Sequence, residues 1–262
     1  MRSSQRSIFK KFKLFDSHFH IIDKRFPLIP NQGFIPDEFS VLDYKERMKQ
    51  YDLVGGAIVS GSFQGFDQSY LINALKELGE NFVGVTNLKS DVSDEHLFYL
   101  NGLGVRGVRF NLKRGGSEGV RSLEGFAKRI YETVKWHVDL YLDSRDLKEL
   151  KDIIVKLPLV VIDHLGLSKD GLKTLFYLVE RGVYVKASGF GRVDFDVRKV
   201  IREIVNINPN LLMFGTDLPS TRAKRPYLDD DFLLILDALS EPEAEKIFYK
   251  NAVEFYKPKI VD

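Results

Sequence analysis

The chain has 262 residues, of which 44% are hydrophobic and 29% charged, and its net charge is +2. This near-balance of charge excludes a strong electrostatic field for nucleic acid or an anionic membrane. The absence of cysteine excludes disulfides and thiolate metal sites and fits a cytoplasmic protein.

The first 12 residues are basic and lack the apolar core of a secretory signal. They predict a short solvated arm leading into the first strand, with a transit peptide as the alternative. No later stretch reaches the ~18 consecutive apolar residues of a membrane-spanning helix.

Eight short apolar runs rich in β-branched residues predict eight strands. In chain order they cover residues 13–19, 53–61, 82–88, 105–112, 137–144, 158–166, 183–189 and 211–219. Because these runs are nearly continuous in apolar residues, they favour parallel strands buried on both faces.

Segments with helical periodicity alternate with these runs. They cover residues 69–79, 95–104, 122–136, 145–157, 172–182 and 196–207, and two more helices are expected at 229–239 and 241–258. This alternation predicts a (β/α)8 TIM barrel with C-terminal helices, forming one domain over residues 1–262. A doubly wound open sheet is the alternative, but it favours a glycine-rich phosphate turn after the first strand, and no glycine lies there.

Catalytic groups of such barrels lie at the C-terminal ends of the strands. The first strand ends in His18 and His20, whose i, i+2 spacing directs both side chains to one face. The sixth ends in His164 and the eighth in Asp217. These four residues are the candidate catalytic set. The other two histidines lie on a predicted helix and at the start of a strand.

The motifs DSHFH, VRGVRFN, VVIDHLG, FGTDLP and IFYKNAVEFY together resemble the amidohydrolase superfamily over nearly the whole chain. The similarity is to its amidohydrolase-related branch, and there to the 2-pyrone-4,6-dicarboxylate lactonase-like group. The resemblance implies a distorted TIM barrel that hydrolyses a carbonyl compound, with Asp217 as the general base. It implies that His18, His20 and His164 bind a divalent metal or, in metal-free members, hold the substrate carbonyl.

The fifth strand departs from many metal-dependent relatives, which place a Lys or His ligand there. Here its end offers Tyr141, Asp143 and Ser144. The expected centre is therefore either one divalent ion, most suitably Zn²⁺, or no metal at all. Its ligands would be His18, His20 and Asp217, with His164 as a fourth candidate. The lactonase-like group also has Tyr at this place, which favours the metal-independent mode.

Arginines follow the fourth and seventh strands, and arginine binds carboxylates in a bidentate manner. The resemblance makes Arg109, Arg114 and Arg192 substrate clamps, assisted by Tyr141. Loops 60–66 and 218–227 are expected near the pocket. The dicarboxylate lactonases carry a further Arg where this chain has Leu167, so the substrate itself is left open.

These observations predict a hydrolase that opens a carboxylate-bearing lactone or similar cyclic ester through water activated by Asp217. A single-zinc decarboxylase or another metal-dependent amidohydrolase on the same scaffold is the alternative, and an inactive binding barrel is a third. The expected partner is a small-molecule carboxylate, not nucleic acid or a membrane.

Overall fold

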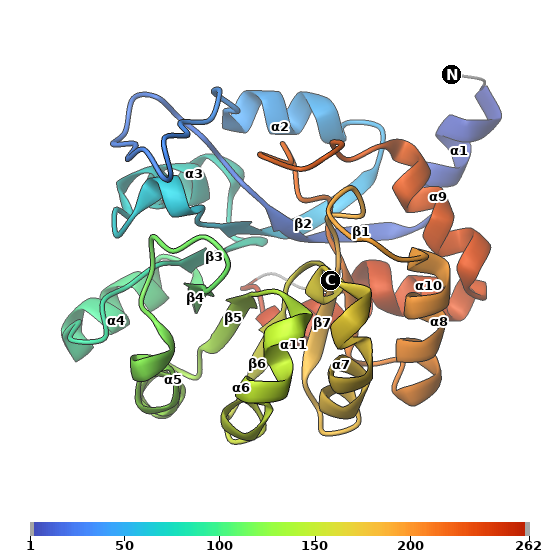
Figure 1. Ribbon diagram of the computed structural model, residues 1–262. Coiled ribbons are helices and arrows are strands. Elements are labelled where there is room, and N and C mark those ends of the chain that lie inside the picture. The colour runs from blue at the N-terminus through green and yellow to red at the C-terminus, as the bar shows by residue number, and fades with distance from the viewer. Residues whose placement is uncertain (1–2, 260–262) are drawn as a thin grey trace.

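The computed structural model describes residues 3–259 and contains an eight-stranded parallel sheet with the strand order β1 to β8 (Figure 1). Helices surround the strands, as a (β/α)8 barrel requires (Figure 1). The strands are β1 (Lys13–Phe19), β2 (Asp52–Val59), β3 (Phe82–Thr86), β4 (Val105–Asn111), β5 (His137–Tyr141), β6 (Val160–Ile162), β7 (Tyr184–Ala187) and β8 (Leu212–Phe214). The predicted barrel is confirmed. The assignment of residues 1–262 to one domain stays a prediction.

Each helix that the periodicity predicts is present. The helices are α1 (Ser3–Lys11), α2 (Val41–Met48), α3 (Ser69–Leu78), α4 (Asp94–Gly102), α5 (Val120–Val134), α6 (Leu147–Ile154), α7 (Leu172–Val179), α8 (Val197–Ile207), α9 (Asp229–Ala238), α10 (Glu241–Glu245) and α11 (Asn251–Tyr256). A π-helical turn, Lys246–Lys250, joins α10 to α11. Across residues 3–259, no helix has the length and apolar character needed to cross a membrane.

The sequence prediction missed α1 and α2. A capping box between Ser40 and Asp43 begins α2, and this motif is visible in the sequence. The expectation of a solvated N-terminal arm is wrong for the end of α1. The ring of Phe9 is buried against Tyr51 and Phe232, so this segment packs on the outside of the barrel.

Strands β2 to β8 end earlier than predicted, β6 and β8 most of all. The chain leaves β6 at Ile162 and β8 at Phe214, whereas the predicted strands run on to residues 166 and 219. His164 and Asp217 then adopt left-handed φ angles of 52° and 61°, which a parallel ladder does not accommodate. The residues beyond these strands therefore turn into the mouth of the barrel.

The opposite, N-terminal end of the barrel is an apolar floor. Buried side chains from inside the barrel pack there against α11, and Phe15 stacks on Tyr256 with ring centroids 5.5 Å apart. The hydroxyl of Tyr256 also donates to the carbonyl oxygen of Ser17. The C-terminal helix thus closes the floor, which leaves the mouth as the open end.

Candidate active site

The site lies on the seam between the first and last strands. The Asp217 amide donates to the His18 carbonyl at 2.7 Å, and the His20 amide donates to the Leu218 carbonyl at 2.7 Å. Beside these bonds, the buried carboxylate of Asp16 accepts from the Thr216 amide at 2.8 Å and the Thr216 hydroxyl at 2.7 Å. The bonds that join β1 to the segment after β8 therefore bring the predicted histidines and aspartate together.

Three imidazoles converge on one carboxylate oxygen. The distances from Nε2 to Asp217 Oδ1 are 3.9 Å for His18, 3.6 Å for His20 and 3.8 Å for His164. Within residues 3–259, Asp217 Oδ1 and His18 Nε2 have no hydrogen-bond partner, although both are buried. Buried polar atoms are normally paired. This point in the mouth therefore has the geometry to hold a water, a substrate oxygen or a metal ion.

The other ring nitrogens fix how these imidazoles are oriented. His20 Nδ1 lies 2.6 Å from the carbonyl oxygen of Val59. A carbonyl only accepts, so His20 carries its proton on Nδ1 and presents a lone pair from Nε2. His164 Nδ1 lies 2.9 Å from the hydroxyl of Ser188, which can act as donor or acceptor. Burial lowers the pKa of His164 to about 3 and also lowers that of His20, so both rings are neutral near pH 7.

Asp217 is held as a carboxylate. Burial alone would raise its pKa, but the Arg192 guanidinium outweighs burial and holds the pKa well below its usual range. Arg192 Nε donates to Asp217 Oδ2 at 2.6 Å and the guanidinium also donates to the Thr221 carbonyl. One carboxylate oxygen is thus occupied by Arg192, while the other faces the histidines.

The backbone around the site is strained. Besides His164 and Asp217, the non-glycine residues Leu165, Ser220 and Arg222 have φ between 53° and 65°. Such conformations cost roughly 1–3 kcal/mol each and concentrate at functional sites. The strained residues lie in the two segments, after β6 and after β8, that also carry His164 and Asp217.

A buried charge cluster lies beneath the histidines. Lys186 Nζ lies 2.5 Å from Asp139 Oδ2, 3.3 Å from Asp163 Oδ1 and 3.3 Å from His18 Nδ1. Asp163 also contacts His18 Nδ1 at 3.2 Å and Arg109 Nη2 at 2.8 Å. Two carboxylates are thereby matched by one ammonium and one guanidinium. Burial opposes ionisation of Asp163, but Lys186, His18 and Arg109 hold its pKa well below the usual range.

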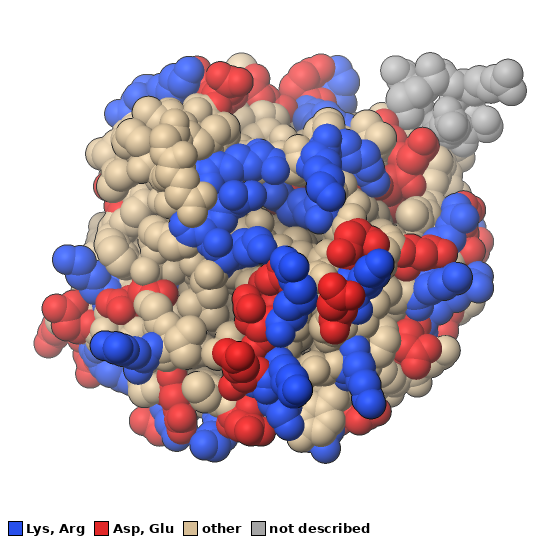
Figure 2. All heavy atoms as spheres, in the orientation of Figure 1, with Lys and Arg blue, Asp and Glu red and all other residues tan. Residues whose placement is uncertain are grey.

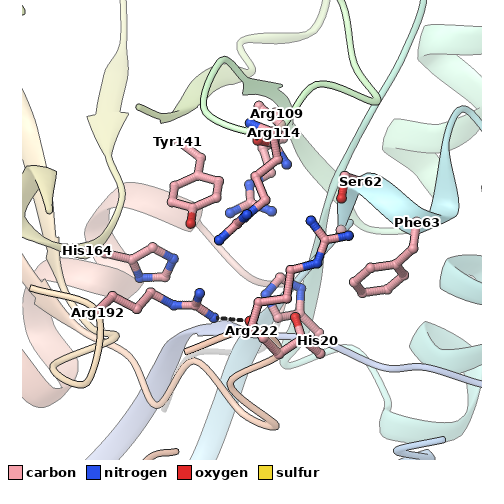
Figure 3. A pocket seen from close by; sticks show the side chains of 12 residues that line it. His20, Ser62, Phe63, Arg109, Arg114, Tyr141, His164, Arg192 and Arg222 are labelled. Atoms are coloured by element: carbon pink, nitrogen blue, oxygen red, sulfur yellow. Dashed lines mark hydrogen bonds between the residues drawn. The ribbon is translucent and has the colours of Figure 1, made fainter. Parts of the chain in front are cut away.

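Most of the predicted site residues line one pocket above this cluster. Its lining includes His20, Arg109, Arg114, Tyr141, His164 and Arg192 (Figure 3). Gly61, Ser62 and Phe63 come from the first predicted loop, and Thr221 and Arg222 from the second. His96 on α4 and His137 at the start of β5 lie outside this lining, as the sequence indicates.

Two predicted clamps already have internal partners. Arg109 bonds Asp163 through Nε and Nη2 and the Ser60 carbonyl through Nη1, while Arg192 bonds Asp217. Sequence analysis did not find Asp163, Asp139 or Asp16. The sequence does contain a signal for these residues. Each acidic residue lies inside a buried strand or directly before a strand-end histidine, and a buried carboxylate requires a cationic or hydrogen-bonding partner.

The mouth also has ligand sets for a metal. The ligand atoms of His18, His20 and Asp217 lie within 4.8 Å of one another, as do those of His18, Asp163 and His164. Neutral imidazoles with a carboxylate are suitable ligands for one Zn²⁺. The first set also contains the two orphaned atoms, so it fits a single divalent ion.

The amidohydrolase family model matches residues 15–257. This chain belongs to that family. A 2-pyrone-4,6-dicarboxylate hydrolase of Comamonas testosteroni is 27% identical over 94% of this chain and 90% of its own length. A 4-sulfomuconolactone hydrolase of Hydrogenophaga intermedia is 25% identical over 90% of this chain and 86% of its own.

Solved structures agree with the fold of this amidohydrolase. A probable 2-pyrone-4,6-dicarboxylic acid hydrolase of Acinetobacter baumannii, with citric acid bound, has a TM-score of 0.80 and 21% identity over 93% of this chain and 99% of its own. A Pseudomonas putida structure described as a putative hydrolase of the same acid has a TM-score of 0.78 and 24% identity, covering 95% and 98% of the two chains. The chain is a hydrolase, as predicted. The decarboxylase alternative is not favoured, because the curated relatives are hydrolases.

Proposed function

We propose that this amidohydrolase opens a carboxylate-bearing lactone or similar cyclic ester. The observation that carries the proposal is the convergence of three imidazoles, whose pKa values burial lowers, on Asp217 Oδ1 beside a pocket lined by arginines. The names of the two bacterial relatives describe hydrolases of acid-bearing lactones, which supports this substrate class.

The attacking water binds between Asp217 Oδ1 and His20 Nε2. Both atoms are hydrogen-bond acceptors, so they accept the two water protons and direct an oxygen lone pair at the carbonyl carbon. As the new C–O bond forms, Asp217 takes one proton as general base. When the ring C–O bond breaks, that proton passes to the departing ring oxygen, and the product is an open hydroxy acid.

The carbonyl oxygen is stabilised from the opposite side. In the tautomer in which Nδ1 accepts from the Ser188 hydroxyl, His164 directs an Nε2–H toward the mouth. Arg109, Tyr141 and Arg192 line the same wall and add donors and positive potential. His18, anchored by Asp163, supports the rear of the water site.

The metal-independent mode is part of this proposal. The charge of Asp217 is already balanced by Arg192, and the Lys186 ammonium lies 3.3 Å from His18 Nδ1, so fixed cations surround the place where an ion would bind. If His18, His20 and Asp217 held one divalent ion, it would lower the pKa of its bound water to about 7. Elemental analysis of protein purified without added metal distinguishes the modes. Full activity with metal far below one equivalent supports the proposal, whereas activity proportional to metal content overturns the metal-independent mode.

The test of the proposed function is a panel of acid-bearing lactones assayed with wild type and Asp217→Asn. We expect wild type to open at least one of them and the variant to be roughly 10²–10⁴-fold slower, because the general base is lost. Asp143→Asn is the matched control, since this carboxylate lies at the same rim but pairs with Lys113 and Arg145. Equal rates for wild type and Asp217→Asn would rule out the assigned role.

A cytoplasmic location and the absence of nucleic-acid and membrane partners remain predictions from the sequence.

A further inference from the structure

A buried lysine lies directly behind the histidines of the site. Figure 2 shows many Lys and Arg side chains on the surface of the molecule. The side chain of Lys186, on β7, instead has no exposed surface. Removing an ammonium from water is costly, so a lysine in this position requires specific partners.

Two carboxylates keep Lys186 charged. Its Nζ lies 2.5 Å from Asp139 Oδ2 and 3.3 Å from Asp163 Oδ1. Burial opposes the charge, but the Asp139 carboxylate outweighs burial and raises the pKa of Lys186 above its usual value. The group is therefore an ammonium, which has three N–H donors and no lone pair.

The third contact of this ammonium fixes where His18 carries its proton. Lys186 Nζ lies 3.3 Å from His18 Nδ1 in hydrogen-bond geometry. Because an ammonium only donates, Nδ1 must accept, and the single proton of the neutral ring lies on Nε2. Asp163 Oδ1 is 3.2 Å from the same Nδ1, but within residues 3–259 this oxygen has no hydrogen-bond partner, so the contact lacks the alignment of a hydrogen bond.

The two histidines of the first strand therefore present opposite groups to the mouth. His20 presents a lone pair from Nε2, because its Nδ1–H donates to the Val59 carbonyl. His18 presents an Nε2–H that is buried, has no partner within residues 3–259, and lies 3.9 Å from Asp217 Oδ1, beyond hydrogen-bond reach. A buried donor of this kind requires an acceptor in the space between them.

We propose that Lys186 is a positioning residue that fixes His18 in the Nε2–H tautomer, so that His18 donates to the oxygen of the attacking water. In the proposed mechanism this water gives its protons to Asp217 and His20, which leaves two lone pairs on its oxygen. One faces the carbonyl carbon, and the other accepts from His18. As Asp217 removes a proton, the N–H stabilises the negative charge that grows on the oxygen. This role rests on the proposed function, whereas the tautomer does not.

The same tautomer bears on metal binding. The positions of His18, His20 and Asp217 suit one divalent ion, but coordination needs a lone pair on His18 Nε2. With Lys186 in place, that lone pair becomes available only if the ring proton moves to Nδ1, against the ammonium. The buried lysine thus favours a water site over a metal site.

The first test determines the tautomer directly. Nitrogen-15 NMR of protein labelled at histidine distinguishes protonated from unprotonated ring nitrogens, and His18→Gln and His20→Gln assign the signals. We expect wild-type His18 to carry its proton on Nε2 and His20 to carry its proton on Nδ1. A wild-type His18 protonated on Nδ1 would overturn the proposal.

The variant Lys186→Met/Asp139→Leu removes the donor together with one opposite charge. Replacing a buried ion pair by apolar side chains is often tolerated, and circular dichroism shows whether the variant folds. We expect the His18 proton to move to Nδ1, beside Asp163. Asp139→Asn is the matched control, because it keeps the ammonium and should keep the wild-type tautomer. A folded double variant with His18 still protonated on Nε2 would show that Lys186 does not set the tautomer.

The second test measures Zn²⁺ binding to metal-free protein by calorimetry. The double variant should bind Zn²⁺ at least about tenfold more tightly than wild type, a usual effect of changing the group behind a histidine ligand. Equal affinities would contradict the assigned effect of Lys186 on metal binding.

The third test connects the tautomer to catalysis. On a lactone that wild type opens, the double variant should have a kcat reduced by roughly tenfold or more and a KM within a few-fold of wild type, because Lys186 does not contact the substrate. An unchanged kcat in a variant whose tautomer has switched would contradict the role of His18. If the protein opens no lactone, the proposed function fails, while the NMR and zinc results still decide the tautomer.

Discussion

The two ends of the barrel each bury a histidine, yet the two surroundings differ completely. His164 at the mouth and His137 at the floor are both 1% exposed, and burial lowers the pKa of each to about 3. His164 faces Asp217 and a pocket. His137 instead packs against Phe255 and Tyr256, with ring centroids 4.6 and 5.4 Å away. Burial and a depressed pKa therefore do not distinguish the proposed catalytic histidine from the floor histidine, whereas a convergent carboxylate and an accessible pocket do.

The largest expected effect concerns the charge cluster between the mouth and the floor. Lys186→Met leaves Asp139 and Asp163 buried with too little positive charge, and breaking a buried ion pair costs roughly 3–5 kcal/mol of unfolding free energy. Urea denaturation measures this loss. The double variant Lys186→Met/Asp139→Asn should recover part of it, because one uncompensated charge is removed. If Lys186→Met has the same free energy of unfolding as wild type, the charge cluster does not contribute to the stability of the barrel.

The next effect compares the histidines directly. His164→Asn should reduce kcat on a lactone substrate by roughly 10²–10³-fold, the usual cost of losing one oxyanion donor. His137→Leu should change kcat by less than about threefold, since no reacting atom lies near the floor. Steady-state kinetics on folded variants decides the matter. Similar losses from both substitutions would contradict the distinction between the ends.

The smallest effect is on the pH dependence of stability. The His137 imidazole has a folded pKa of about 3 and a usual value of 6.5, so the unfolded chain binds more protons between these pH values. Its contribution to stability is complete above pH 6.5 and is lost as the pH falls. Between pH 7.5 and 5 this amounts to about 2 kcal/mol.

Chemical denaturation at both pH values, for wild type and His137→Leu, measures that contribution. The variant should lose about 2 kcal/mol less than wild type on acidification. Because the other buried histidines remain in both proteins, the difference isolates His137. If wild type and His137→Leu lose the same unfolding free energy on acidification, His137 titrates normally and the floor is more open to water than its packing indicates.

Much of the architecture could be predicted because it follows from local periodicity. Alternating apolar strands and amphipathic helices identified the barrel, and the rule that strand ends meet at one rim placed His18, His20, His164 and Asp217 together. The helix α1 was missed because the burial of Phe9 depends on Tyr51 and Phe232, which are distant in sequence.

The partners of the arginines could not be predicted for a related reason. Arg109 meets Asp163 across 54 residues, and Arg192 meets Asp217 across 25. Whether an arginine is neutralised or free for a ligand depends on the direction of a side chain in the assembled barrel. The sequence pattern gives only the residue's position at the rim.

The seam between β1 and the segment after β8 links catalysis to the order of protein synthesis. The bond between Asp16 and Thr216 spans 200 residues, so it closes one of the longest loops that this chain can form. Contacts of such high sequence separation form late in folding, because the entropy of the intervening chain must be lost first. A nascent chain carries its two N-terminal histidines throughout elongation but lacks Asp217, the proposed base, until the last strand is made. Under the proposed role of Asp217, hydrolytic activity reports completion of the whole barrel, and a fragment that ends before Asp217 lacks it.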